Sequence, residues 1–174
     1  GERPVRRRFE GFVAAGEDCR FERDGRVEPA VDVGADSQVV DRGAELVEDF
    51  YPVFAQVMRE LGTPVYPRRF FERLAECFAE YCTLVSVRHQ DRPVAGAFLV
   101  GYKDTLEIPW AGTVADMKPR STNMALYSEV LKFAVSRGYR RFDFGRSTVD
   151  SGTYRFKRQW GAIPSQLYWS VWPD

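Results

Sequence analysis

Apolar residues in the first half of the chain recur at helical spacing. Between residues 44 and 61 they return every three or four positions, and Gly62 follows them. This spacing lines one face of a helix with apolar side chains, and a glycine commonly ends a helix. The same spacing returns between Phe70 and Tyr81. The pattern therefore predicts two amphipathic helices, joined by a turn that contains two prolines.

Strand-like patterns follow in close succession. They cover Leu84–Arg88, Val94–Tyr102 and Thr105–Trp110, and short polar turns separate them. Consecutive strands joined by short turns are typical of an antiparallel meander. A third helix is expected at 123–137, with Ser121 or Thr122 as its cap.

The last part of the chain predicts a strand, a loop and a short helix. Two phenylalanines alternate with Arg141 and Asp143, so one strand face is aromatic and the other is charged. Gly145 lets the backbone turn tightly or approach a ligand, and Arg146 and Ser147 follow it at the end of the strand. In open α/β sheets this edge is where ligands usually bind.

A helical turn at 151–160 and a final strand at 166–172 complete the pattern. In the short helix Lys157 is an ammonium beside aromatic residues, and Thr153 shares its stripe four positions earlier. Summed along the chain, the elements have the order ααβββαβαβ. We therefore expect an α/β (α+β) fold.

The length of 174 residues predicts a single domain with a sizeable core. Residues 1–42 are rich in charged residues and glycine, and they predict only a short helix or strand followed by a linker. The domain itself is expected at 43–174. Because the chain starts at Gly1 and not at methionine, we expect it to be a fragment of a longer protein.

Charge and cysteine content narrow the functional classes. The 25 basic and 25 acidic residues cancel, so no overall positive field favours nucleic acid. Three cysteines without close pairing and a single histidine, His89, do not predict a metal site or a Cys/His nucleophile. No apolar run reaches the length of a membrane-spanning helix, and no signal peptide is seen, so we expect a cytoplasmic protein.

Two sequence motifs near the end of the chain resemble those of a known family. The motifs are Phe-Asp-Phe-Gly-Arg-Ser at 142–147 and Gly-Thr-Tyr-Arg-Phe-Lys-Arg-Gln-Trp-Gly at 152–161. They resemble the second GNAT-like domain of the FemAB family of aminoacyl and acyl transferases. The similarity extends from about Phe50 to Trp172, and it is closest to the branch found near exopolysaccharide and exosortase systems. It implies a GNAT-like fold, with a mixed central sheet flanked by helices, and a second GNAT-like domain as partner. A homodimer of this domain could take the place of that second domain.

The resemblance also implies an acyl donor between two parting strands. In GNAT enzymes the amino end of a helix meets the donor's phosphates. Here the segment before that helix, residues 116–123, lacks the Gly-x-Gly of the acetyl-CoA loop. We expect no tightly bound cofactor, and a donor that is either aminoacyl-tRNA or acyl-CoA. Arg120, Asn123, Arg146 and Ser147 are the residues expected to hold it.

Acyl transfer to an amine needs a cation for the developing oxyanion and an acceptor for the lost proton. The resemblance assigns the cation to Lys157, although a lysine snorkelling from a surface helix is the plainer alternative. Asp143 is the expected proton acceptor or amine anchor, unless it only pairs with a neighbouring arginine. Trp110 and Tyr127 are expected either to line the acceptor cleft or to pack in the core, and Thr153 is expected to contact substrate.

Three functions remain open at this point. The leading hypothesis is transfer of an acyl or aminoacyl group to an amine of a cell-envelope or polysaccharide precursor. The second is an acyl-CoA-dependent N-acetyltransferase made of a single domain. The third is a module without catalytic activity that recognises a glycan or a protein.

Overall fold

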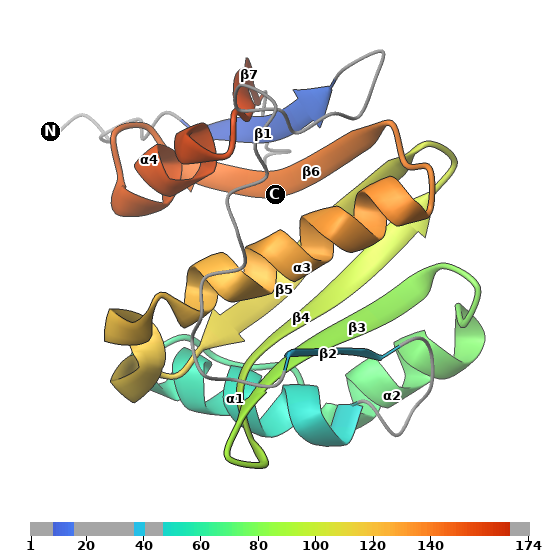
Figure 1. Cartoon of the computed structure of the whole chain (residues 1–174), viewed down its shortest axis with the longest axis vertical. Helices are drawn as coiled ribbons and strands as arrows, with labels where there is room; N and C mark the ends of the chain where they lie inside the picture. Colours follow the sequence, from blue (N-terminus) through green and yellow to red (C-terminus); the bar gives the residue numbers. More distant parts are fainter. Residues whose placement is uncertain (1–8, 16–36, 41–46, 168–174) are drawn as a thin grey trace, which may run out of the picture.

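A mixed sheet of seven strands organises the chain (Figure 1). The computed structural model describes residues 9–15, 37–40 and 47–167, and it gives the backbone alone for 9–15, 37–40 and 118–120. Neighbouring strands follow the order β2-β3-β4-β5-β6-β1-β7. The helices and strands are β1 Phe9–Ala15, β2 Ser37–Val40, α1 Val47–Glu60, α2 Arg68–Cys77, β3 Cys82–His89, β4 Arg92–Tyr102, β5 Thr105–Thr113, the 3₁₀ helix η2 Ala115–Arg120, α3 Thr122–Ser136, β6 Arg141–Thr148, α4 Gly152–Gln159 and β7 Ile163–Gln166.

From α1 onward the helices and strands follow the predicted order ααβββαβαβ, and the predicted α/β fold is confirmed. The last strand differs from its predicted bounds. β7 ends at Gln166, where the predicted strand begins, and residues 168–172 of that prediction lie outside the described residues.

The first 42 residues contribute two strands to the same sheet. β1 pairs antiparallel with both β6 and β7, and β2 pairs antiparallel with β3. The sequence pattern predicts at most one short helix or strand here. Strand pairing over a long sequence separation leaves no local pattern, so the two strands could not be read from these residues alone.

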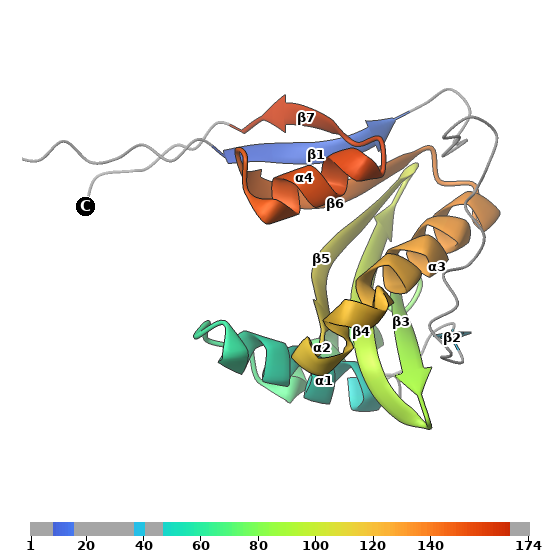
Figure 2. The ribbon, with the colours of Figure 1, turned by 60° about the vertical axis from the view of Figure 1, so that its left-hand side comes forward.

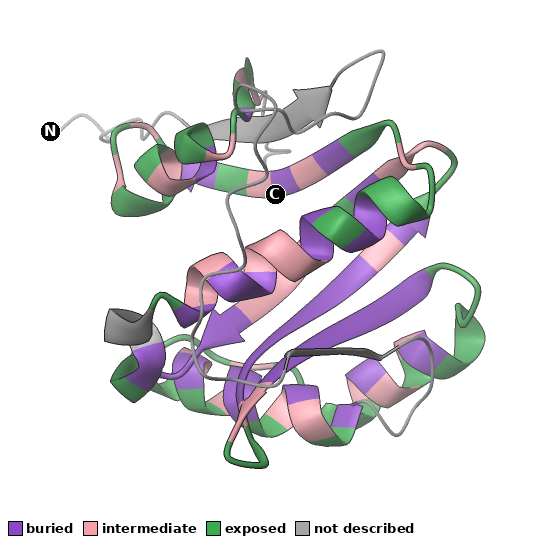
Figure 3. Cartoon of the chain, in the orientation of Figure 1, coloured by how far each residue is buried: buried purple, intermediate pink, exposed green. Residues whose placement is uncertain are grey.

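The sheet is covered on both faces around β3, β4 and β5, and Figure 3 colours β3 and β4 largely as buried. On one face α1 and α2 enclose an aromatic cluster around Phe50, Phe71 and Phe98. On the other face α3 packs its own apolar residues, including Leu126 and Val130, against the strands. Strands buried on both faces read as nearly continuous apolar runs, which explains why β4 was recognisable from sequence.

The start of α3 departs from the predicted capping. Ser121 occupies the cap position with φ of 58°, but its side chain makes no capping hydrogen bond. The Thr122 hydroxyl instead donates to the carbonyl of Met117 at 3.0 Å. A left-handed residue at the cap turns its side chain away from the first amides, so backbone geometry overrides the expected serine or threonine cap.

Within the described ranges, no helix combines the length and apolar character needed to cross a bilayer.

Candidate active site

β5 and β6 are parallel neighbours that pair only where they begin. Their partners are Thr105 with Arg141, Leu106 with Phe142, and Glu107 with Asp143. Beyond this point both strands continue, β5 to residue 113 and β6 to residue 148, without pairing to each other. Figure 2 shows the two strands diverging from this common start.

Irregularities in both strands coincide with their separation. Against β4, the β5 register shifts between Glu107 and Trp110, and Pro109 lies within that shift. Against β1, the β6 register shifts between Asp143 and Gly145. A bulge bends its strand, and proline has no N–H to extend a ladder, so both strands turn away from each other.

A cleft of about 530 Å³ lies at this separation. Its walls come from the diverging stretches of the two strands and from one residue after β7. The lining residues are Glu107, Ile108, Pro109, Asp143, Phe144, Gly145, Arg146 and Leu167. Two carboxylates and a guanidinium in a concave, partly apolar space are the arrangement expected of a ligand site.

The carboxylates of Glu107 and Asp143 belong to the last paired rung. Partial burial raises the pKa of Glu107, and the nearby Asp143 carboxylate raises it further. Asp143 accepts a hydrogen bond from the Gly145 N–H at 2.7 Å. The sequence left open a pairing of Asp143 with a neighbouring arginine such as Arg141. In the structure the Arg141 guanidinium donates to the Asp104 carboxylate at 3.2 Å. Asp143 therefore both faces the cleft and shapes its wall.

Lys157 lies buried beneath this wall, with 6% of the residue exposed. Its ammonium donates to the carbonyls of Gly145 and Arg146, both at 2.9 Å. Burial lowers the pKa of Lys157 to about 8, and the Asp143 carboxylate opposes this shift. The alternative of a lysine snorkelling into solvent is wrong. The ammonium is nevertheless bound to main-chain oxygens, and Lys157 is not among the residues that line the cleft.

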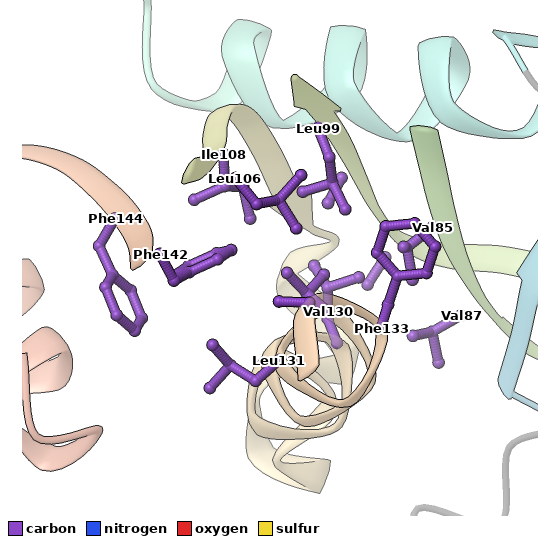
Figure 4. Close-up of a cluster of buried hydrophobic side chains, with 14 of the residues drawn as sticks. Val85, Val87, Leu99, Leu106, Ile108, Val130, Leu131, Phe133, Phe142 and Phe144 are labelled. Carbon is purple, nitrogen blue, oxygen red and sulfur yellow. The ribbon is translucent and has the colours of Figure 1, made fainter. Parts of the chain in front are cut away.

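Tyr127 joins three elements behind the cleft. Its ring stacks on Phe144 with centroids 5.8 Å apart, and it meets Phe156 of α4 edge-on at 4.9 Å. Burial raises its pKa to about 12. Figure 4 shows the neighbouring ring of Phe142 pointing from β6 toward Leu106 and Leu131. These contacts fix α3 and α4 against β6, and a role of Tyr127 in binding substrate stays a prediction.

Trp110 packs with the aromatic cluster on the α2 face. It lies edge-on to Phe70, Phe71 and Phe98, at centroid distances of 5.8, 5.2 and 5.7 Å. It is not among the residues that line the cleft. The core alternative describes these contacts, and a substrate role for Trp110 stays a prediction.

The remaining predicted residues are spread along the site. Ser147 is 5% exposed, and its hydroxyl has no hydrogen-bond partner among the described residues. The side-chain oxygen of Asn123 accepts from the Thr113 hydroxyl at 3.4 Å. Thr153 shares a hydrogen bond with Ser151, the cap of α4, at 2.9 Å. The side chain of Arg120 lies outside the described residues.

Sequence reasoning missed five residues that line the cleft: Glu107, Ile108, Pro109, Phe144 and Leu167. One signal for them was present. A proline inside a strand pattern marks a bulge or an edge, and Pro109 interrupts an otherwise regular strand. The facing of Glu107 and Asp143 depends on a parallel register between residues far apart in sequence, which the pattern does not contain.

Comparisons with known proteins agree with this geometry. The family model described as an acetyltransferase (GNAT) domain matches residues 17–158. No curated protein matches the chain. Among solved structures, FemX is similar with a TM-score of 0.71 and 12% identity, covering 90% of this chain and 59% of its own.

Two further solved structures are similar. The C-terminal domain of a proposed lysylphosphatidylglycerol synthetase from Agrobacterium fabrum has a TM-score of 0.68 and 13% identity, covering 90% of this chain and 57% of its own. A GCN5-related N-acetyltransferase from Sphaerobacter thermophilus has a TM-score of 0.63 and 17% identity, covering 95% and 50%.

At these identities the structural likeness shows the fold alone, and this chain spans 50 to 59% of the length of those three structures. The family match covers most of the chain, and the parted parallel strands are those that the resemblance implied. The chain belongs to the GNAT acetyltransferase domain family.

Proposed function

We propose that this domain transfers an acyl or aminoacyl group to an amine of a cell-envelope or polysaccharide precursor. The observation that carries the proposal is the cleft between β5 and β6, with two carboxylates and Arg146 in its walls. Membership of the GNAT family makes the domain a transferase of acyl groups. The fold likeness to FemX and to a lysylphosphatidylglycerol synthetase domain supports an acceptor in the cell envelope.

The chemistry follows from the groups in the cleft. The amine nitrogen attacks the acyl carbonyl carbon, and the bond from that carbon to the donor's oxygen or sulfur breaks. The attacking neutral amine loses one proton to a carboxylate, and the carboxylic acid so formed passes this proton to the leaving oxygen or sulfur. Glu107 suits this step because its raised pKa makes it a better proton acceptor than an ordinary glutamate. Asp143, on the same rung, anchors the amine or shares the proton.

Arg146 is the group proposed to bind the donor, because a guanidinium binds phosphate through two parallel hydrogen bonds. It is exposed and lines the cleft. Aminoacyl-tRNA is the favoured donor. The Gly-x-Gly loop is replaced by the 3₁₀ helix η2, and Thr122 bonds back to Met117 within that turn. Acyl-CoA is the second candidate, because the matching family is one of acetyltransferases.

The acceptor site that we propose includes residues from outside this chain. FemX is longer than the described fold, since 59% of its length is covered. A second GNAT-like domain, or a second copy of this one, would complete the acceptor site in the arrangement that we propose. A cytoplasmic location remains an expectation from the sequence.

Transfer assays with two kinds of donor test the proposal. Radiolabelled aminoacyl-tRNAs and acetyl-CoA would each be supplied with glucosamine or a lysine-containing precursor peptide as acceptor. We expect label to pass to the amine from one donor class. Glu107→Gln and Asp143→Asn should each lower the rate by about a hundredfold or more, as loss of a proton acceptor does.

The matched control is Asp91→Asn, in the turn between β3 and β4, which should leave the rate unchanged. Asparagine at 143 can still accept the Gly145 N–H, so a loss there reports charge and not shape. Absence of transfer from every donor, with glycan or peptide binding retained, would support the recognition module and overturn the transferase. Full activity in both cleft variants would remove the assigned roles.

A further inference from the structure

The geometry around α4 points to a role for Lys157 other than the stabilisation of an oxyanion that the family resemblance implies. We propose that Lys157 is a positioning residue: its ammonium holds the Gly145–Arg146 wall of the cleft in shape. The inference rests on the proposed function, because it concerns the cleft in which transfer would occur.

The contacts of the ammonium go to the cleft wall. Nζ donates to the carbonyl oxygens of Gly145 and Arg146, each at 2.9 Å. An ammonium has three N–H donors, so two of them serve these carbonyls. Both residues line the cleft, whereas Lys157 itself does not. The lysine therefore affects the shape of the cleft only through the backbone carbonyls that it binds.

The bulge in β6 explains why this wall needs a side chain. The β6 register against β1 shifts between Asp143 and Gly145, and no further pairing to β5 follows. Gly145 and Arg146 still pair with β1, but they have no ladder partner on the β5 side. A buried carbonyl without a partner is costly, so a carbonyl turned away from β1 needs another donor. Gly145 has φ of 70°, a conformation that glycine adopts without steric cost.

Side chains bind both polar groups of Gly145. Its N–H donates to Asp143 at 2.7 Å, and its carbonyl accepts from Lys157 at 2.9 Å. Two opposed bonds fix the orientation of the peptide planes on either side of this residue. The direction in which Arg146 leaves the strand is set by those planes. Lys157 thus controls where the guanidinium stands in the cleft.

The placement of α4 agrees with this role. Phe156 of α4 contacts Tyr127, and Tyr127 stacks on Phe144. The helix therefore packs on the strand face that carries Phe142 and Phe144. Side chains alternate along a strand, so Asp143 points to the other face. Lys157, which belongs to α4, therefore approaches the wall from the face that carries Phe144.

Hydrogen exchange on the substrate-free protein tests the proposal. Lys157→Met keeps the length of the side chain and removes the charge. We expect exchange of the amides at 143–148 to quicken by about tenfold or more, as loss of buried hydrogen bonds allows local opening. Amides of β3 and β4 should keep their protection. Lys157→Arg, which can still donate to both carbonyls, should restore slow exchange.

The matched control is Lys132→Met on α3, which removes an exposed ammonium paired with Glu129 and should leave the wall unchanged. Unchanged exchange at 143–148 in Lys157→Met would overturn the proposal. So would a loss of protection across the whole sheet that arginine does not rescue. Neither outcome involves a donor or an acceptor, so a failure here is separate from a failure of the transfer assay.

A spectroscopic measurement on the unaltered protein keeps the proposal falsifiable if Lys157→Met does not fold. The carbonyl ¹³C signals of Gly145 and Arg146 should move together in one alkaline step as the ammonium loses its proton. The Asp143 carboxylate on β6 acts on the ammonium. The other charged or titratable groups on the elements that pack here are Arg146 on β6, Glu107 on the rung that faces Asp143, and Tyr127 on α3, which contacts Phe156 of α4. If the two carbonyl chemical shifts do not change in the alkaline pH range, or change at different pH values, the proposed role of Lys157 is wrong.

Discussion

The two halves of the sheet differ in which kinds of side chain they bury. β3, β4 and β5 lie between helices, and β4 buries six consecutive residues from Val94 to Leu99. β6 alternates between buried and accessible residues, and α4 packs against it. Among the described residues, the one charged side chain that is buried is Lys157, in this second half. We conclude that β3 and β4 provide stability, and that the cleft forms where β5 and β6 lose regular pairing.

The difference has a physical cause. A strand covered on both faces gains most from apolar side chains, because the hydrophobic effect scales with the apolar area removed from water. A strand whose ladder ends early leaves backbone groups that need side-chain partners. Lys157 and Asp143 are those partners for Gly145. The polar groups that complete the fold of β6 are therefore the same groups that shape the site.

The largest predicted effect lies in the first half. Phe98 is fully buried and contacts the rings of Phe50, Phe71 and Trp110. Phe98→Ala should lower the free energy of unfolding by about 3–5 kcal/mol, because it leaves a cavity in a packed cluster. Chemical denaturation measures this, with Tyr102→Ala, at an exposed position of the same strand, as control. A cost below that of the control would break the assignment of stability to this half.

The second effect is a pH dependence that comes from the second half. Burial lowers the pKa of Lys157 from 10.5 to about 8. The unfolded chain therefore holds the proton more tightly, so the free energy of unfolding should increase as pH rises from about 8 to 10.5. Below pH 8 the penalty for burying the ammonium is fully present. The rise should amount to about 3 kcal/mol at most.

Denaturation curves of the unaltered protein and of Lys157→Met across this pH range check the sign. The difference between the two isolates Lys157, because other lysines and tyrosines titrate in both proteins. A difference that stays constant from pH 7 to 10.5 would contradict the lowered pKa. A difference of opposite slope would mean that folding favours the charged form, so that the two carbonyls outweigh burial.

The smallest effect compares two glycines. Gly145 and Gly62 have φ of 70° and 65°, and an added Cβ would meet no atom within 4 Å at either position. Gly145→Ala and Gly62→Ala should therefore each cost about 1–2 kcal/mol through backbone conformation alone. Only Gly145→Ala should also lower the transfer rate, because only Gly145 lines the cleft. Equal loss of activity in both variants would show that the cleft does not depend on this wall.

Much of the fold could be predicted because its signals are local. The helices at 47–60 and 68–77 bury one face each, and their apolar residues recur with helical spacing. The strands at 82–102 are apolar runs between polar turns. Lys157 and Asp143 could be singled out because each lies in a motif that resembles the family. The motifs did not predict which groups the ammonium binds, because that depends on a bulge in β6 set by its pairing with β1.

The sequence by itself determined the order of helices and strands from residue 47 onward, the apolar faces that they bury, and the family. Each of these depends on residues that are close together in the chain. Only the tertiary structure decided which rung of β5 faces β6, where the two strands part, and that Lys157 binds the wall of the cleft. Those features depend on register between distant segments, and a pattern of apolar and polar positions does not encode register across a parallel pair.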